Sequence, residues 1–498
     1  MKKMNRHELS RRQFLRTASM ASMAGIYASP FLLELNSLAA MAQGTATDYK
    51  ALVCVFLSGG NDGHGTVIAT DTPSFSAFTT ARSGAPGLAY NQTDLLPIVL
   101  KTPQTGRTFA LNPALVGVQN LFNAGRAAVV ANTGTLVAPT TKAQIQANSV
   151  PLPASLYSHF DQTAAWQAIT ANGGSAVHEG WGGAMADLIA SMNTNSAFTC
   201  ISTSGIALFL SGQTSYQLNV TSAGPIPISG LSKPLFGSQA GTSALSSILT
   251  AEENNLFAKE YEVVISRSTA AQATLATAML AAGPGGVANP PQYLDPITSK
   301  LTNNNFATSL QTVARIIGGR SGLGVSRQIF YVTLGGFDTH DNQAPQIARL
   351  LTQLGQGLEY FDATLTTLGV NNQVTTFTAS DFGRTLTANS DGTDHGWGSH
   401  HIVTGGAVAG GDMYGQYPVI GSNQANDTGA GRLIPTTSVE QYAGTLARWF
   451  GLSDSQIKEP VWACQRDAHW GHDVQRGKGA SQTGASAICS NQVFSVGF

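Results

Sequence analysis

The chain has 498 residues, of which 11% are charged and 42% are hydrophobic, and its formal net charge is −1. A sequence this apolar is not that of a disordered chain. The near-neutral charge leaves no basic footprint for nucleic acid or for an anionic membrane surface, so we expect no nucleic-acid partner.

The N-terminus has the three regions of a twin-arginine export signal. The stretch SRRQFLR occupies 10–16, basic residues precede it, and an apolar stretch follows at 18–33. Ala40-Met41-Ala42 matches an A-x-A cleavage site. We therefore expect a signal peptide at 1–42, recognition by the twin-arginine export machinery, and a periplasmic or extracellular mature protein. Pro30 and Glu34 interrupt the apolar stretch, which favours cleavage over a stable membrane anchor.

Residues 43–498 show no Pro/Ser-rich linker, charge run or fixed-period repeat, which favours a single domain with loop insertions. Four cysteines allow three pairings. Cys54 falls inside an apolar run and is interpreted as a buried thiol. Cys464 and Cys489 are the favoured disulfide pair, because both lie in the loop-rich tail of an exported chain.

Apolar runs of strand length alternate with helical patterns along the chain. In chain order we predict a strand at 51–57, a loop at 71–112, a helix at 113–124, a strand at 127–131, helices at 158–171 and 184–192, short strands and turns at 197–240, helices at 243–282 and 305–317, a strand at 328–334, a helix at 345–368, a strand at 374–378 and a helix at 438–450. This alternation predicts an α/β fold with a mostly parallel sheet.

Three predicted strands end in acidic or Gly-rich exits. They lead into Asn61-Asp62, Asp338-Thr339-His340 and Asp381, and Asp394-His395 follows in a loop. Ligands of open α/β sheets bind beyond the carboxyl ends of the strands, so the exits should converge. Asp/His pairs are typical ligands of divalent metals. In the alternative interpretation the aspartates only cap turns, as Asp62 would in an Asx turn.

Two further residues have competing roles. Ser158 begins a predicted helix, where it is either an N-cap or a nucleophile beside a bound anion; Thr133 and Thr135 compete for the second role. Arg384 either pairs with Asp381 or clamps an oxyanion with its bidentate fork. Of the remaining histidines, His64 and one of His400 and His401 are possible site residues, and the others are interpreted as surface or structural residues: His178, His469 and His472.

A set of motifs spread over roughly 50–450 resembles one family. These motifs are SGGNDG at 58–63, SHFDQ at 158–162, GWGG at 180–183, GGFDTH at 335–340, SDFGRT at 380–385 and GTDHGWGSHH at 392–401. Together with the export signal they resemble a bacterial family catalogued as a domain of unknown function and grouped with the alkaline phosphatase and sulfatase superfamily.

The resemblance implies a doubly wound sheet with helices on both faces and hydrolysis of a phosphate or sulfate ester, in a small molecule or a polymer. It also implies one or two divalent metals (zinc, calcium, magnesium or manganese) and a Ser, Thr or modified Cys nucleophile, matched by position to Ser158. The implied metal ligands are Asp62 or its neighbour Asn61, Asp338, His340, Asp381 and His395.

One departure from the superfamily pattern is Asp381-Phe382, where active members carry Asp-His. The missing imidazole leaves open a different class of function. In that alternative the chain is a non-catalytic exported protein, for binding or envelope assembly, on a degenerate hydrolase scaffold.

Overall fold

A buried strand, β1 (Lys50–Ser58), lies at the centre of the fold, and its residues 51–57 are all buried. It pairs in parallel with β11 (Arg327–Gly335) on one side and with β12 (Val374–Ser380) on the other. A strand covered on both faces needs apolar residues at successive positions rather than alternating ones. The continuous apolar runs therefore predicted these three strands correctly.

The computed structural model describes residues 49–168, 179–249, 255–280, 286–421 and 423–457. The export signal, the Cys464–Cys489 pair, His178, His469 and His472 lie outside these residues. Within them, no helix is long and apolar enough to cross a membrane. Cys54 and Cys200 are free and buried, as expected for Cys54.

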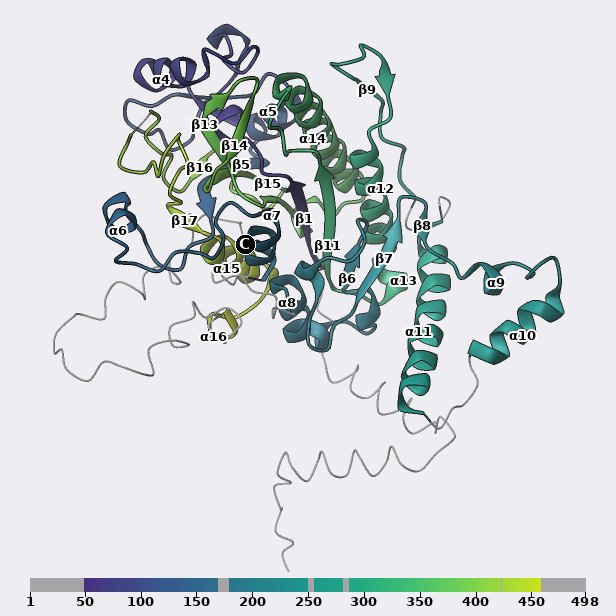
Figure 1. The fold of residues 1–498 in the computed structure, drawn as a ribbon. Helices are drawn as coiled ribbons and strands as arrows, with labels where there is room; N and C mark the ends of the chain where they lie inside the picture. Colours follow the sequence, from purple (N-terminus) through teal and green to yellow (C-terminus); the bar gives the residue numbers. More distant parts are fainter. Residues whose placement is uncertain (1–48, 169–178, 250–254, 281–285, 422, 458–498) are drawn as a thin grey trace, which may run out of the picture. The chain divides into compact units, whose positions relative to one another are not determined.

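The central sheet of the described residues has ten strands and is drawn in Figure 1, and three small sheets lie outside it. In spatial order, the strands are β16 (Met413–Tyr414), β5 (Ala127–Gly134), β15 (Ser399–Thr404), β12, β1, β11, β6 (Cys200–Ser202), β7 (Gln217–Thr221) and β8 (Gly224–Pro225), with β17 (Thr437–Ser438) also paired to β5. Most pairs are parallel, whereas β15 runs antiparallel to both its neighbours and β8 runs antiparallel to β7. The expected mostly parallel sheet is confirmed.

Helices cover both faces of the sheet. On β1, Val53, Val55 and Leu57 belong to one apolar cluster, whereas Leu52 and Phe56 belong to another. The first cluster includes side chains of α5 (Val116–Asn123), α12 (Asn305–Gly318) and α14 (Gln343–Thr367), and the second those of α7 (His159–Ala168), α8 (Trp181–Ile189) and α15 (Val439–Phe450). Successive strand residues point to opposite faces, so each face is sealed by its own helices, as predicted.

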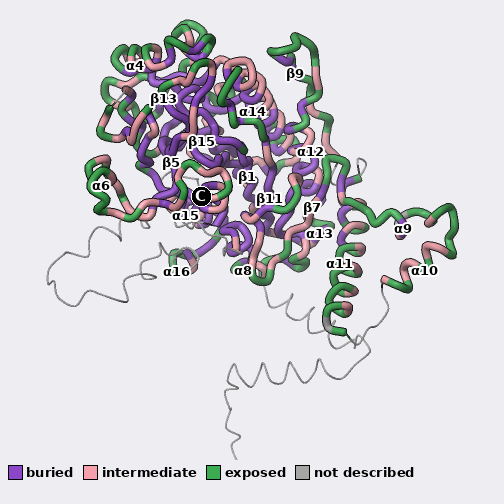
Figure 2. The backbone as a smooth tube through the Cα atoms, in the orientation of Figure 1, coloured by how far each residue is buried: buried purple, intermediate pink, exposed green. Residues whose placement is uncertain are grey.

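The remaining α-helices and strands complete the description of the fold. Outside the central sheet they are α3 (Gly63–Thr66), β2 (Val67–Ala69), α4 (Thr72–Arg82), β3 (Leu96–Ile98), β4 (Phe109–Leu111), α6 (Lys142–Gln146), α9 (Ser229–Ser232), α10 (Gln239–Leu249), α11 (Leu256–Ala278), β9 (Tyr293–Leu294), β10 (Leu301–Thr302), α13 (Arg320–Leu323), β13 (Arg384–Asn389), β14 (Gly392–His395) and α16 (Asp454–Ile457). Among them, β2-β4-β3, β9-β10 and β13-β14 form the three small sheets. Figure 2 shows that burial is concentrated along the central strands, whereas α10 buries no residue.

The predicted loop at 71–112 is wrong, because this segment contains α4 and two strands. Helix α4 starts at an Asp71 cap with a proline in its first turn. It buries Ser74, Phe78 and Arg82, which are four residues apart on one helix face. Only one of the three is apolar, so the hydrophobic periodicity that identifies a helix is missing.

Candidate metal centre

The exits of the three central strands approach one another closely at β1. Gly59 and Gly60 have φ values of +117° and +87°, which favour glycine. A Cβ on Gly59 would lie 2.3 Å from the backbone nitrogen of Asp338. The same Gly59 N–H donates to Oδ1 of Asp381 over 3.1 Å. The glycines therefore let β1 leave the sheet directly between the two aspartates.

Asp338 is the centre of a histidine cluster. Its Oδ1 lies 3.0 Å from Nε2 of His340, 3.2 Å from Nε2 of His395 and 3.4 Å from Nε2 of His159. Burial opposes ionisation, but the hydrogen bond and the positive charge of the Arg384 guanidinium hold the pKa of Asp338 below its ordinary value. Asp338 is therefore a carboxylate faced by three imidazoles.

The contact made by Nδ1 of His395 decides which of its two ring nitrogens carries the proton. Nδ1 lies 2.8 Å from the backbone carbonyl of Tyr157, and a carbonyl can only accept, so Nδ1 carries the proton. Burial lowers the pKa of His395, which favours the neutral ring. Its Nε2 then presents a lone pair to the Asp338 carboxylate.

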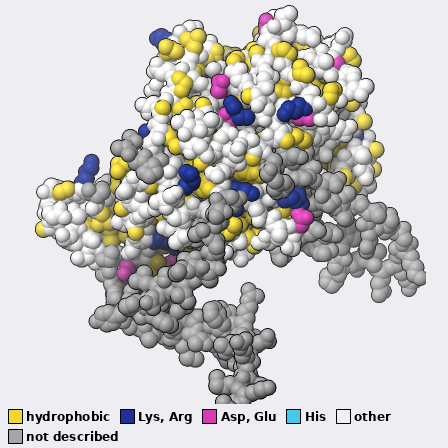
Figure 3. All heavy atoms as spheres, turned by 180° about the vertical axis from the view of Figure 1, so that it is seen from behind, with side chains coloured by type: hydrophobic (Ala, Val, Ile, Leu, Met, Phe, Trp, Pro, Cys, Tyr) yellow, Lys and Arg dark blue, Asp and Glu magenta, His cyan; other side chains and the backbone are white. Residues whose placement is uncertain are grey.

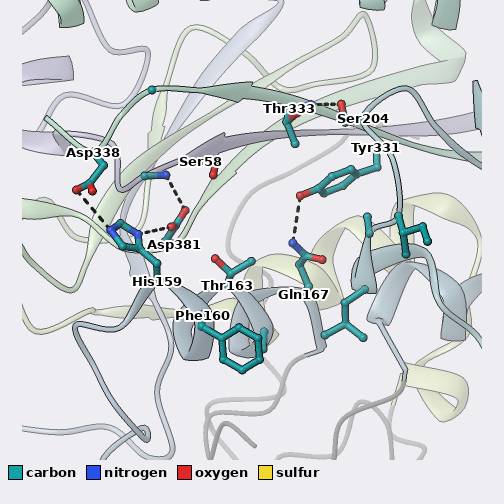
Figure 4. Close-up of a pocket in the computed structure, with 16 residues that line it drawn as sticks. Ser58, His159, Phe160, Thr163, Gln167, Ser204, Tyr331, Thr333, Asp338 and Asp381 are labelled. Carbon is teal, nitrogen blue, oxygen red and sulfur yellow. Dashed lines mark hydrogen bonds and ion pairs between the residues drawn. The ribbon is translucent and has the colours of Figure 1, made fainter. Parts of the chain in front are cut away.

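His159 is the first residue of α7, and its ring is held in a similar way to that of His395. Its Nδ1 lies 2.6 Å from Oδ2 of Asp381, a carboxylate that accepts the ring proton. Its Nε2 is buried and makes no hydrogen bond with any described residue. This nitrogen lies 3.4 Å from Oδ1 of Asp338, and Figure 4 marks the contact with a dashed line.

The three atoms fit a divalent cation. Ligand atoms of His159, Asp338 and His395 lie within 4.8 Å of one another. Acceptor atoms repel one another unless a positive charge lies between them, and a carboxylate paired with two imidazoles is a common metal-ligand set. His340 lies beside them, with Nε2 2.9 Å from that of His395.

A cavity of about 760 Å³ opens beside this cluster. His159, Asp338 and Asp381 lie at one end of it, and Tyr331, Ser204 and Thr333 lie at the other (Figure 4). A volume of this size is typical of small-molecule sites. The cluster therefore faces a space large enough for a substrate.

Comparison with known proteins identifies a family. Residues 49–461 match the model of a family described as "Protein of unknown function (DUF1501)". The chain belongs to the DUF1501 family. The expected resemblance to an uncharacterised family is thus confirmed, and no curated protein matches the chain.

Solved structures show only distant likeness to this DUF1501 protein. The crystal structure of Ps i-CgsB is 8% identical with a TM-score of 0.33, over 83% of this chain and 74% of that one. The same protein in complex with k-i-k-neocarrahexaose gives 8% and 0.34, over 82% and 74%. A structure described under glycosaminoglycan metabolism by Bacteroides thetaiotaomicron gives 9% and 0.30, over 82% and 74%. Scores this low imply nothing about chemistry.

The structure brings together four of the five predicted metal ligands of this DUF1501 protein. Asp338 and His395 lie in the cluster, His340 is adjacent to both, and Asp381 acts through His159 rather than directly. Asp62 lies apart. Its carboxylate binds Arg82 bidentately over 2.7 and 2.9 Å and is almost fully buried.

The buried Asp62 carboxylate has no free oxygen for a metal. Besides Arg82, it accepts hydrogen bonds from Gln343 and from the Gly65 N–H, the latter capping α3. The turn-capping interpretation of Asp62 therefore describes its contacts better than the ligand interpretation. The neighbouring Asn61 is also buried, and its Oδ1 accepts from Thr66.

Ser158 and Arg384 are held in roles other than those proposed for catalysis. The Ser158 hydroxyl accepts from the Asp161 N–H over 3.4 Å, a long helix cap, and Ser158 does not line the cavity. Arg384 is buried, and Nη1 donates to the Gly59 carbonyl and to Asp338, not to Asp381. Its Nε donates to Thr393. The guanidinium thus positions Asp338 and presents no free fork for an oxyanion.

Phe382 occupies the place of the missing imidazole. Its ring is buried and packs against those of His159 and His395, with centroids 4.8 and 4.6 Å apart. It holds the two imidazoles in place without offering a ligand atom. A second metal at this position would lack the nitrogen that the superfamily pattern supplies.

The other described histidines lie outside the cluster. His400 accepts from the Asn132 N–H, His401 packs on Trp166, and His64 contacts the Gly431 carbonyl. The ligand that sequence reasoning missed is His159. Its only signal was its place at a predicted helix start beside Ser158, with no indication that Asp381 would lie next to it.

Proposed function

We propose that this DUF1501 protein is a metal-dependent hydrolase of a phosphate or sulfate ester. The observation that carries the proposal is the position of two imidazole nitrogens beside one carboxylate oxygen. Nε2 of His159 and Nε2 of His395 both point at Oδ1 of Asp338, since each ring has its other nitrogen bound to an acceptor. Three converging acceptors beside a substrate-sized cavity are the ligand pattern of a catalytic rather than a closed structural site.

The chemistry of the ligands favours one group of metals. Two imidazoles and one carboxylate suit zinc or a similar transition metal better than calcium or magnesium, which prefer oxygen ligands. When bound, such an ion supplies Lewis-acid stabilisation of the ester oxyanion and lowers the pKa of water.

The side chains of this chain have separate tasks in the proposed reaction. Asp381 keeps the proton on Nδ1 of His159, and the Tyr157 carbonyl does the same for His395. Arg384 keeps Asp338 ionised and in place. These contacts resemble the outer hydrogen bonds that orient metal ligands in other proteins.

We assign the attack to water, since Ser158 caps a helix away from the cavity wall. The water oxygen bonds to phosphorus or sulfur while the ester bond to the alcohol oxygen breaks. One proton of the water ends on the leaving alcohol, and the hydroxide stays on the released phosphate or sulfate.

The proposal also includes export by the twin-arginine pathway, supported by the motif at 10–16. That route carries folded proteins, which suits a chain whose ligands come from distant strands and must be assembled before a metal binds.

The decisive experiment measures metal content and turnover together. Purified mature protein is analysed for bound metals and then assayed on chromogenic phosphate and sulfate esters with metal add-back. Asp338→Ala should lose both metal and turnover, whereas Asp94→Ala, at an exposed position, should keep both.

An Asp338→Ala protein with unchanged metal content would overturn the site. A wild-type protein that binds metal but cleaves no ester would instead favour a non-catalytic binding protein. Phe382 is the observation that makes this second candidate worth testing.

A further inference from the structure

No Lys or Arg occurs among the described residues that line the 760 Å³ cavity. Among its 16 lining residues, the fully charged side chains are Asp338 and Asp381. Sites for polyanions such as sulfated polymers or nucleic acids depend on Arg and Lys clusters. Away from the proposed metal, an additional anion on a substrate would find no Arg or Lys to pair with among these residues.

The far end of the cavity offers neutral hydrogen-bond donors. Gln167 donates to the Tyr331 hydroxyl over 3.1 Å, and its own oxygen accepts from the Phe209 N–H. The Tyr331 hydroxyl proton is therefore not used by Gln167, and burial raises its pKa so that the proton is retained. Thr163 adds a second hydroxyl that hydrogen-bonds to no described residue (Figure 4).

The cavity mouth is apolar. Phe160 on α7 and Ile206, in the loop after β6, both line it and are 74% and 84% exposed. Both side chains offer apolar surface to a ligand that enters the cavity. A flat aromatic ring such as Phe160 stacks on an aryl or a sugar ring.

We infer that this cavity binds the alcohol part of the substrate, and that this part is uncharged and presents an apolar ring face. The inference rests on the proposed function for the position of the anionic head. The head lies at the His159–Asp338 end, the neutral ring stacks on Phe160 and Ile206, and its polar groups meet Tyr331 and Thr163. The substrate class is therefore the monoester of an aryl or unsubstituted sugar alcohol, and polyanionic esters are excluded.

A matched pair of inert ligands tests this independently of turnover. Binding of benzylphosphonate and of its ring-carboxylated analogue is measured by calorimetry on the metal-loaded full chain. The wild type should bind the uncharged ring at least about tenfold more tightly, because the added carboxylate loses water without gaining a cationic partner. A hexose phosphonate serves as a third ligand and distinguishes a sugar from an aryl preference.

Two variants that each add one lysine, one at the cavity mouth and one away from it, form a matched pair. Ile206→Lys should reduce or reverse the preference, whereas Val99→Lys, equally 84% exposed but away from the cavity, should behave as wild type. Equal affinities in the wild type, no phosphonate binding at all, or an unchanged ratio in Ile206→Lys would overturn the inference.

The outcomes separate this inference from the proposed function. Selective phosphonate binding without hydrolysis of para-nitrophenyl phosphate or sulfate would refute the enzyme but retain the cavity's ligand class. Hydrolysis of these esters without any preference for the uncharged ring would support the enzyme but refute the inferred ligand class of the cavity.

Discussion

Nδ1 of His159 lies 2.6 Å from Oδ2 of Asp381, although 222 positions separate the two residues in the chain. This contact decides which nitrogen of His159 faces Asp338. It joins the first turn of α7 to the end of β12, and Phe382 packs on the same imidazole. The aspartate that was predicted as a metal ligand therefore contacts the proposed metal site through a histidine.

Asp381→Asn should weaken metal binding about 10- to 100-fold, the usual effect of losing an outer hydrogen bond to a ligand. The amide oxygen would still accept from Gly59, so its NH₂ group would face His159. His159 would then accept on Nδ1 and carry its proton on Nε2, where the lone pair is needed. Competition with a chromophoric chelator measures the affinity. Wild-type affinity in Asp381→Asn would contradict this role.

His395→Ala should lose more metal than His340→Ala. His395 belongs to the group of three ligand atoms, and its tautomer is fixed by Tyr157. His340 is more exposed, at 42% of its side chain, and its Nδ1 has only a 3.4 Å contact to Asp394. Elemental analysis of the two variants, purified in parallel, shows which of them has lost more metal. Equal losses would mean that His340 is a full ligand.

Asp62→Asn should destabilise the fold by about 3–5 kcal/mol, since it leaves the Arg82 guanidinium buried without its counter-charge. Metal content of the folded protein should stay at the wild-type value, because Asp62 is outside the cluster. Denaturant unfolding measures the first quantity and elemental analysis the second. Asp94→Asn, an exposed control, should change stability by no more than about 0.5 kcal/mol. Metal loss in folded Asp62→Asn would restore its predicted ligand role.

Acid should destabilise the protein through its buried histidines. Burial lowers the pKa of His64 to about 4 and those of His400 and His401 to about 3, against an ordinary value of 6.5. Below pH 6.5 these three histidines become protonated in the unfolded chain but stay neutral in the folded chain. Their stabilising contribution is therefore complete above about pH 7 and is lost as the pH falls toward about 4.

The melting temperature should fall as the pH falls across this range. It should fall less steeply for the His401→Phe variant than for the wild type. Phenylalanine should be tolerated there, because His401 lies among Trp166 and Tyr442 and its Nε2 has no hydrogen-bond partner within the described chain. Parallel curves for the variant and the wild type would rule out a contribution from His401.

Much of the fold follows from local pattern. The strands β1, β11 and β12 are continuous apolar or β-branched runs because helices cover both their faces. Their exits converge because parallel strands end at the same edge of a sheet, which is why Asp338 and Asp381 were placed together correctly. Helix α4 was missed because its buried face is mostly polar.

The sequence by itself determined the α/β class, the glycine exits and the aspartates and histidines available at them. These depend on residue type and on spacing within one element. Only the tertiary structure decided that Asp62 pairs with Arg82 and that Arg384 pairs with Asp338. It also decided that His159 rather than Asp381 contributes an atom to the cluster. Ion pairs and ligand contacts form between residues far apart in the chain. Such pairs leave no periodic signal, because each depends on which side chains the packed sheet and its helices bring within a few ångströms.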